Sequence, residues 1–431
     1  MKPHVHFREI EGRSPGYYAL LGLLGLLVLA GLVSALYMEI EGHWVTGMNN
    51  RIVWGTPHVF AVFLIVAASG ALNVASIASV FGRLQYKPLA PLSGLLAIAL
   101  LVGGLAVLVL DLGRPDRLIV AMTHYNFKSI FAWNIFLYTG FMAIVAAYLW
   151  TMMDRMGRPY AKAAGLLAFV WRLILTTGTG SIFGWLVARQ AYDAAIMAPM
   201  FIVFSFAYGL AIFLLVLLAA YQWTGRPLGD GLLRRLKNLL GIFVAASFYF
   251  VAVYHLTNLY AAEHAGIERF ILLEGGVYTA LFWGGQVLVG YLLPMAIVFS
   301  GLGRSRTWIA TAAVLVVIGG LAQMYVTIIG GQAYPLILFP GKEVSSSFFD
   351  GVVAEYAPSL PEVLLGVGGI AIALLGVAVA VRVLRFLPED LRDELVEAQA
   401  GAGESGSSGT AGGEQAGSAA PETAAASGSA G

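Results

Sequence analysis

The chain has 431 residues, of which 59% are hydrophobic and only 11% are charged. A soluble domain carries about 25% charged residues, so this composition excludes an ordinary soluble enzyme and indicates a polytopic membrane protein. The net charge of +1 gives no sign of nucleic-acid binding. The sequence has no cysteine, which excludes a Cys-ligated iron–sulfur cluster or a c-type haem of its own.

Ten apolar stretches follow one another along the chain. Each is close to the ~20 residues that a helix needs to cross a bilayer. We therefore predict an all-α bundle of about ten transmembrane helices, because a membrane β-barrel would need short alternating segments instead. The predicted spans are Tyr17–Met38, Pro57–Val80, Leu89–Leu110, Ile130–Trp150, Ala163–Ala188, Ile196–Tyr221, Lys237–Ala261, Gly275–Ser300, Thr307–Gly330 and Glu362–Val381.

Three regions are expected: a terminal segment over residues 1–16, the membrane domain over 17–387 and a tail over 388–431. The tail begins with a charged segment and continues as Ala, Gly, Ser and Glu, a composition that buries too little apolar area to fold, so its end is expected to be disordered. Between the last two spans, residues 331–361 form a long, partly apolar loop, which is typical of a lid or a docking surface.

The distribution of basic residues predicts the orientation. Most of the 25 Lys and Arg residues flank the spans on the side of both termini. By the positive-inside rule, both termini face the cytoplasm, and in a bacterium the protein lies in the inner membrane with its opposite loops in the periplasm. A cleaved signal ending near Ala35 is the alternative for the first helix, but acidic Glu9 and Glu11 in the leader favour a retained helix.

The second span begins with a polar group close to the outer boundary. His58 follows Pro57, and Asn50 and Trp54 are close in sequence. An imidazole at this depth can hydrogen-bond a carbonyl and exchange protons, and ionisable groups inside a membrane usually serve function. The alternative is an interfacial histidine beside a tryptophan of the aromatic belt.

The third span ends in a turn that contains Asp111 and Arg114. Alone, this turn is a helix stop with a predicted ion pair between the two side chains. Together with Asn134 near the start of the next span, it forms one wall of a predicted polar pocket at the outer surface.

Arg172 lies inside the fifth span and is followed by Thr176 and Thr177. We expect no carboxylate inside another span to neutralise it, so backbone carbonyls or hydroxyl groups must bind the guanidinium. These residues, with His255 near the outer end of the seventh span, are candidates for a proton path; a structural role is the alternative for His255. His58 and His255 are the one pair that could ligate a haem b, which we do not expect, and no metal site is predicted.

The run Asp111–Pro115 resembles the corresponding turn of the NrfD/PsrC family, the membrane subunits of polysulfide reductases. The stretch from His43 to His58, continued by Gly70–Ser76, is similar to the DsrP branch of that family, the membrane subunit of DsrMKJOP-type complexes. The resemblance covers the ten-helix region and not the tail.

This resemblance implies two four-helix bundles, formed by spans two to five and six to nine, with an extra helix at each end. It also implies an exchangeable quinone (menaquinone or ubiquinone) and electron exchange with a periplasmic iron–sulfur subunit, a c-type cytochrome and further membrane or cytoplasmic subunits in sulfur metabolism. The quinone would bind at the outer end of the first bundle, with His58 and Asp111 passing protons. The matching positions are Asn50, Trp54, His58, Asp111, Arg114 and Asn134.

Two other functions fit the composition. A secondary transporter would also have about ten helices, and Arg172 could then bind an anion such as a sulfur oxyanion. A membrane anchor without a ligand is the third alternative. The polar residues gather at one membrane face rather than at the midplane, which favours the quinone-linked function.

Overall fold

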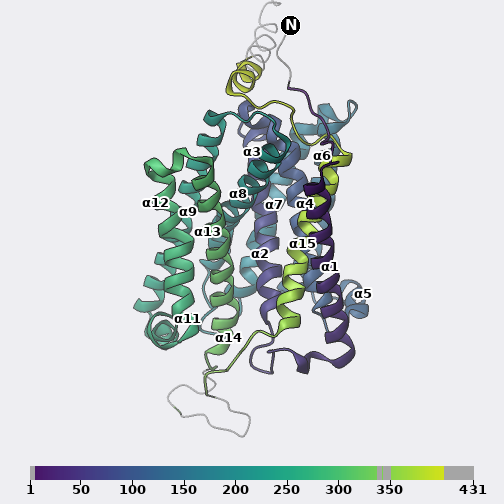
Figure 1. Cartoon of the computed structure of the whole chain (residues 1–431). Helices are drawn as coiled ribbons and strands as arrows, with labels where there is room; N and C mark the ends of the chain where they lie inside the picture. The colour runs from purple at the N-terminus through teal and green to yellow at the C-terminus, as the bar shows by residue number, and fades with distance from the viewer. Residues whose placement is uncertain (1–4, 337–341, 343–350, 402–431) are drawn as a thin grey trace, which may run out of the picture.

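The computed structural model describes residues 5–336, residue 342 and residues 351–401. Within these ranges, ten helical stretches are long and apolar enough to cross a membrane. They stand side by side in an all-α assembly (Figure 1), which confirms the predicted fold class. Much of the loop predicted over 331–361 and the tail end that is expected to be disordered lie outside the described residues.

The first bundle contains the second to fifth spans. Its helices are α2 (Thr56–Ala71) with α3 (Asn73–Ser79), α4 (Ala90–Leu110), α6 (Ile130–Met153) and α7 (Ala161–Gly184). The prediction of one continuous helix over 57–80 was wrong. The hydroxyl of Ser93, on α4, donates to the carbonyl of Ala71 (2.6 Å) and accepts from the amide of Ala75 (3.1 Å). A side chain inserted between these two backbone groups is a recognised cause of a helix break.

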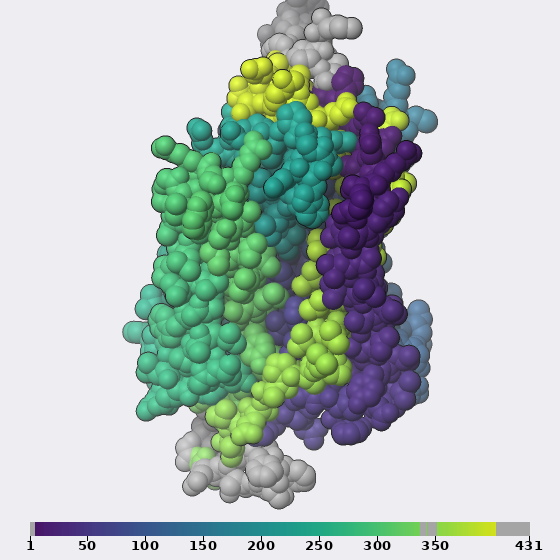
Figure 2. Space-filling model, in the orientation of Figure 1, coloured from purple at the N-terminus to yellow at the C-terminus, as the bar shows by residue number. Residues whose placement is uncertain are grey.

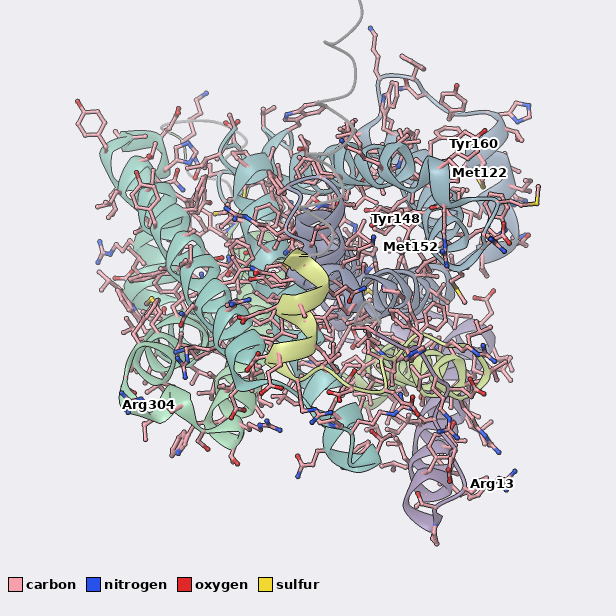
Figure 3. All side chains as sticks on the ribbon, turned by 90° about the horizontal axis from the view of Figure 1, so that it is seen from above. Arg13, Met122, Tyr148, Met152, Tyr160 and Arg304 are labelled. Atoms are coloured by element: carbon pink, nitrogen blue, oxygen red, sulfur yellow. The ribbon has the colours of Figure 1, made fainter. Side chains whose placement is uncertain are left out.

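The second bundle contains the sixth to ninth spans. They are α8 (Met197–Thr224), α9 (Asp230–Tyr260), the segment from α11 (Val277–Ala280) through a π-helical stretch (Leu281–Leu292) to α12 (Leu293–Phe299), and α13 (Arg306–Tyr325). A π-helical stretch (Val326–Gly330) and α14 (Gly331–Ala333) continue the last helix outward. Seen along the helices in Figure 3, Arg304 of this bundle and Tyr160 of the first lie at opposite edges of the molecule.

The two extra helices lie together against the first bundle. α1 (Pro15–Glu41) packs on α15 (Leu360–Val383), and α15 also contacts α4 and α2. Figure 2 shows these first and last spans running side by side along one flank. The crossing of α1 and α15 is close: a Cβ added at Gly31 would lie 3.0 Å from the Cα of Gly368. Small residues permit such contacts between membrane helices.

The two bundles meet where α2 crosses α8. A Cβ at Gly70 would overlap the carbonyl of Ser205, and a Cβ at Gly209 would overlap the backbone of Ala71. Only glycine therefore allows the two backbones to approach this closely. The contact fixes the first bundle, which holds the polar groups described below, against the second.

At the end of the molecule that carries both termini, the segment after α15 folds back onto the bundle. Residues 393–401 are helical. The carboxylate of Asp393 accepts hydrogen bonds from the amides of Gly231 (2.8 Å) and Leu232 (2.9 Å) at the start of α9. Asp393 therefore satisfies two of the four amides that a helix start leaves unpaired.

Candidate functional site

At the other end of the first bundle, His58 and Asp111 come together. His58 lies in the first turn of α2, where Gly55 is the N-cap and Pro57 occupies the start of the helix. Asp111 is the C-cap of α4. Nδ1 of His58 lies 2.9 Å from Oδ2 of Asp111, and the imidazole is 18% exposed while the carboxylate is 1% exposed. Two side chains from different helices thus form a contact between an imidazole and a buried carboxylate.

The carboxylate of Asp111 is poorly satisfied for a buried group. Neither of its oxygens accepts a hydrogen bond of good geometry from the described residues, and Nδ1 of His58 also lacks such a partner despite the short distance. A buried carboxylate without donors carries a large desolvation cost. The site therefore favours an additional proton, a water molecule or a ligand donor.

His43 is a third member of the site, which the sequence analysis did not single out. Its Nε2 lies 3.0 Å from the backbone carbonyl of Asp111 and 3.9 Å from Oδ1 of the same residue. A carbonyl oxygen only accepts, so Nε2 of His43 carries the hydrogen. The signal available in the sequence was a second histidine close to His58, but only the fold shows that it reaches the end of α4.

Trp54 provides an aromatic wall beside His58. Its ring stacks near the imidazole, with centroids 6.2 Å apart and planes 27° apart, and it packs against Phe131, Phe183 and Tyr192. Such faces suit a flat conjugated ring, which gains from offset stacking and edge contacts. The histidine–carboxylate pair therefore lies at the edge of an aromatic surface.

The segment that leads into α2 is fixed from the second bundle. The side-chain carbonyl of Gln332 accepts from the amides of Val53 (3.0 Å) and Trp54 (3.1 Å), and its amide nitrogen donates to the carbonyl of Trp54 (2.9 Å). Arg189 donates to the carbonyls of Gln332 and Arg51, each at 2.9 Å. These contacts determine where Trp54 and His58 stand.

A second set of contacts ties the same segment to α15. Oη of Tyr356 receives the amide hydrogen of Thr56 (2.7 Å) and donates to Glu362 (2.6 Å), whose other oxygen accepts from the amide of Gly47 (2.9 Å). Burial raises the pKa of Tyr356, and the hydrogen bond to Glu362 raises it further, so the phenol stays protonated and continues to donate. Glu362 is fully buried and also completes the capping box of α15 with Ser359.

The predicted pair between Asp111 and Arg114 was wrong. Asp111 turns inward to His58, whereas Arg114 is exposed and binds Asp116, with Nη2 and Oδ2 3.0 Å apart. The hydrogen bond from Arg114 lowers the pKa of Asp116. The physical reason is the chain direction: the backbone leaves α4 at Asp111 and carries Arg114 into solvent-exposed structure.

Two other predicted quinone-binding residues lie apart from the pair. Asn50 is exposed in the turn before α2. Asn134 is buried, and its amide nitrogen donates to the carbonyls of Ile130 (2.9 Å) and Gly178 (3.2 Å). Because both of its donors are used between α6 and α7, Asn134 acts as a packing residue in this conformation.

Arg172 is bound by a closed network in the first bundle. Its guanidinium donates to the side-chain oxygen of Asn73 and to the carbonyl of Ser69 (3.2 Å), and the rings of Phe169 and Phe206 lie 5.1 and 5.3 Å from it. Thr176 bonds the hydroxyl of Ser69 at 2.6 Å. The expected backbone carbonyl is confirmed, and the amide of Asn73 completes the set. Thr177 is half-buried on the same helix.

His255 belongs to a separate cluster in the second bundle. Its Nδ1 lies 2.7 Å from Oε2 of Glu268, and Asn258 donates to the other oxygen (2.9 Å). Glu268 is 1% exposed, so the expectation that no buried carboxylate lies near the proposed proton path was wrong. The pair lines a cavity of about 40 Å³ that also contacts Gln286 and Gln323, enough for a small number of water molecules.

The histidines are not arranged as a haem or metal site in the described residues. His58 lies in the first bundle and His255 in the second, and each has its own carboxylate neighbour. Within the same residues, no group of three or more His, Asp or Glu side chains is placed to hold a metal ion.

The fold and the site define a multi-pass membrane protein with a polar centre at one end of its first bundle. Residues 44–335, more than half of the chain, match the family described as "Polysulphide reductase, NrfD". The chain belongs to this NrfD family. The matched residues include the whole polar centre except His43.

Relatives with described roles cover most of the sequence. This protein is 30% identical over 397 residues to the "Hdr-like menaquinol oxidoreductase integral membrane subunit" of Archaeoglobus fulgidus, covering 91% of this chain and 99% of the relative. It is 22% identical to "Protein NrfD" of Escherichia coli, over 57% of this sequence and 84% of the relative. It is 21% identical to the "Menaquinone reductase, integral membrane subunit" of Nitratidesulfovibrio vulgaris, over 84% and 89%.

Proposed function

We propose that this protein is the quinone-binding membrane subunit of a multi-subunit redox complex. The observation that carries the proposal is the buried Asp111 carboxylate, which lacks hydrogen-bond donors among the described residues and lies 2.9 Å from His58 beside an aromatic wall. Two relatives whose names refer to menaquinol or menaquinone support the same ligand class.

The residues present fit a quinone head group. The ring would lie against Trp54, and a carbonyl oxygen would receive a hydrogen bond from His58. Asn50, Arg114 and Asn134, predicted for the same site, would act only after rearrangement, because the first two are exposed and the third is fully bonded. His43 takes their place as a neighbour of Asp111.

A bound quinone supplies two-electron, two-proton chemistry, and the residues of this protein handle the protons. With Asp111 ionised, the imidazole of His58 is favoured with its hydrogen on Nδ1, which leaves Nε2 to exchange a proton with the ligand oxygen. Asp111 then stabilises the imidazolium that forms. Electrons would come from or go to a partner subunit, because a sequence without cysteine cannot ligate an iron–sulfur cluster through thiolates.

We further propose the setting that the resemblance implied: an inner membrane, both termini in the cytoplasm, a periplasmic iron–sulfur subunit with a c-type cytochrome as partners, and a role in sulfur metabolism of the DsrP type. The polar centre lies at the end of the bundle opposite to the termini. This placement would bring it to the periplasmic side, next to such partners.

Proton exchange at His255 is a second proposal. Its contact with Glu268 and the cavity beside them supply an acid–base pair with room for water. Arg172, Thr176 and Thr177 would belong to a path through the first bundle. The contacts of Arg172 and Thr176 end within α2 and α7, so such a path would require water that links them to the surface.

The competing function is anion transport through Arg172. The guanidinium is 3% exposed and is covered by two phenyl rings and the side chain of Asn73. An anion would have to displace these groups, so the arrangement favours a structural role for Arg172.

One experiment separates the functions. The protein is purified in mild detergent, its quinone content is measured after extraction and its haem absorbance is recorded; uptake of sulfite or thiosulfate into vesicles is measured in parallel. We expect near-stoichiometric quinone, no haem band and no uptake. Uptake without quinone would support the transporter instead, and a haem band would make His58 and His255 candidate axial ligands.

A further inference from the structure

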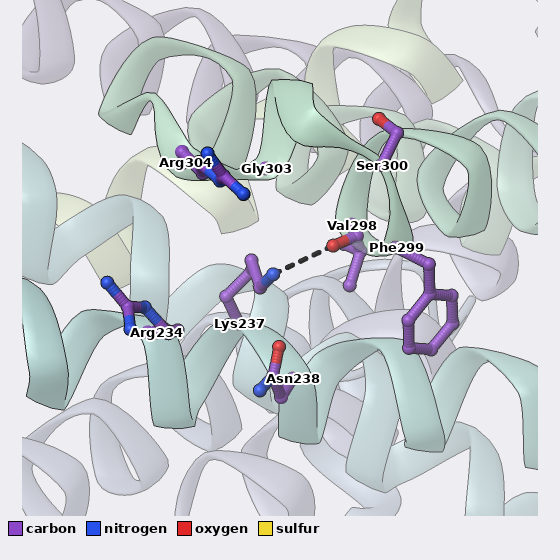
Figure 4. A pocket seen from close by; sticks show the side chains of 8 residues that line it. All are labelled: Arg234, Lys237, Asn238, Val298, Phe299, Ser300, Gly303 and Arg304. Atoms are coloured by element: carbon purple, nitrogen blue, oxygen red, sulfur yellow. Dashed lines mark hydrogen bonds between the residues drawn. The ribbon is translucent and has the colours of Figure 1, made fainter.

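A basic pocket lies at the end of the molecule that carries both termini, opposite to the end that holds His58. It has a volume of about 510 Å³ and opens between the first turns of α9, the end of α12 and the short turn over Gly301–Arg304 (Figure 4). Its lining residues are Arg234, Lys237, Asn238, Val298, Phe299, Ser300, Gly303 and Arg304.

Three cationic side chains surround this space, and none of the eight lining residues is acidic. Lys237 is only 9% exposed and donates to the carbonyl of Val298 (2.8 Å). An ammonium has three donors, so two remain for another acceptor. Arg234 and Arg304 are exposed and form no ion pair with a carboxylate of the described residues; the nearby Asp230 is occupied by Arg306 at 2.7 Å.

The local backbone keeps the pocket open over Lys237. Gly303 is buried, and a Cβ there would lie 2.7 Å from the carbonyl of Val298 and 3.2 Å from Cδ of Lys237. Its lack of a side chain lets the turn pass directly above the lysine. A partly desolvated cation with unused donors gains strongly from an anion that can accept several hydrogen bonds.

The rim of the pocket is apolar on the side of the membrane helices. Phe299 is 61% exposed and lies beside Gly241, while Ile242, the next residue along α9, is 58% exposed and Leu302 is 46% exposed. A ligand with a charged head and hydrocarbon chains would therefore find donors in the pocket and an apolar path beside it. Basic pockets between membrane helices are suited to anionic lipid headgroups.

We propose that Arg234, Lys237 and Arg304 form a binding site for the phosphate of an anionic phospholipid, with the acyl chains lying along Phe299 and Ile242. The shared chemistry is a phosphate group, which a lipid or a soluble phosphate compound could supply. The apolar rim assigns the lipid. The site lies in the second bundle and is independent of the quinone site in the first.

The test measures binding of fluorescent phosphatidylglycerol to the full-length protein in a neutral detergent. In the triple variant Arg234→Gln/Lys237→Gln/Arg304→Gln we expect the affinity to fall on the order of a hundredfold, since each basic side chain near a headgroup contributes a severalfold gain. The control variant Arg13→Gln/Arg155→Gln/Arg158→Gln removes three exposed charges at the same end of the molecule but outside the pocket. It should bind like the wild type.

A second variant and two competitors make the test decisive. Arg234→Gln/Arg304→Gln changes only exposed residues, and we expect the affinity to fall about thirtyfold on the same basis. Excess phosphatidylglycerol should displace the probe, whereas phosphatidylcholine, or inorganic phosphate at constant ionic strength, should not. Equal loss in the control variant or displacement by phosphatidylcholine would overturn the site, and displacement by inorganic phosphate would overturn the lipid as its ligand.

Discussion

The contact between His58 and Asp111 is the feature on which the proposed chemistry depends. The two residues could be selected from the sequence because ionisable groups inside or next to apolar spans are costly. Their pairing could not, because the sequence also offered Arg114 as a partner for Asp111. Only the direction in which the chain leaves α4 decides between the two.

Replacement of Asp111 tests the role of the carboxylate. In Asp111→Asn, the amide cannot stabilise an imidazolium at His58, so we expect quinone-coupled electron transfer by the assembled complex to fall by about 100-fold. The control is Asp116→Asn, an exposed aspartate of the same turn that contacts Arg114 instead. The rate is measured with a water-soluble quinol. A rate within about twofold of the wild type in both variants would show that Asp111 takes no part in proton transfer.

The buried guanidinium gives a prediction about stability. In Asn73→Leu, Arg172 loses a hydrogen-bond acceptor inside the bundle, and we expect a loss of about 1–3 kcal/mol in the free energy of unfolding. The double variant Asn73→Leu/Arg172→Met removes both polar groups and should recover part of this loss. Thermal unfolding in detergent measures both. A double variant less stable than either single variant would contradict the proposed pairing.

Some residues of the site left little trace in the sequence. Gln332 and Tyr356 fix the segment before α2 from the far end of the chain, through bonds to Trp54 and Thr56. Neither stands out as a charged group in an apolar span, and their role depends on which helices meet. His43 was visible as a nearby histidine, but its carbonyl partner belongs to another helix end.

At the scale of helices, hydropathy predicted all ten spans because each must satisfy the same bilayer thickness. It did not predict the break between α2 and α3. That break depends on one hydroxyl, Ser93 of α4, which reaches into the backbone of a neighbouring helix. Hydropathy also carries no information on the π-helical stretch over Leu281–Leu292, since α- and π-helices of one sequence have the same composition.

The crossing of α2 and α8 gives a prediction at this scale. In Gly209→Val, the added carbons overlap the backbone of α2, so the bundles must separate, and we expect a destabilisation of at least about 1–3 kcal/mol. Gly25→Val is the matched control, because a Cβ at Gly25 on α1 meets nothing within 4 Å. The melting temperatures of the two purified variants are compared. Equal values would show that the α2–α8 contact is looser than described.

For the whole molecule, the distribution of Lys and Arg predicts that the termini face the cytoplasm. The absence of cysteine allows a direct test, because each introduced cysteine is the only one in the sequence. In whole cells, a membrane-impermeant maleimide should label Asn50→Cys, and it should label Arg158→Cys only after the inner membrane is permeabilised. Both positions are exposed. The reverse pattern would place the polar centre on the cytoplasmic side and exclude a periplasmic partner.

The most direct test of the central claim is the affinity of the purified protein for a quinone analogue, compared between the wild type and His58→Ala. His58 is partly exposed, so its loss should leave the fold intact, which the melting temperature checks. We predict that one analogue binds per wild-type molecule and that the variant binds at least about tenfold more weakly, because a ligand hydrogen bond to a charged or polarised group is lost. Unchanged affinity in a folded variant would contradict the assignment of the quinone site to His58 and Asp111.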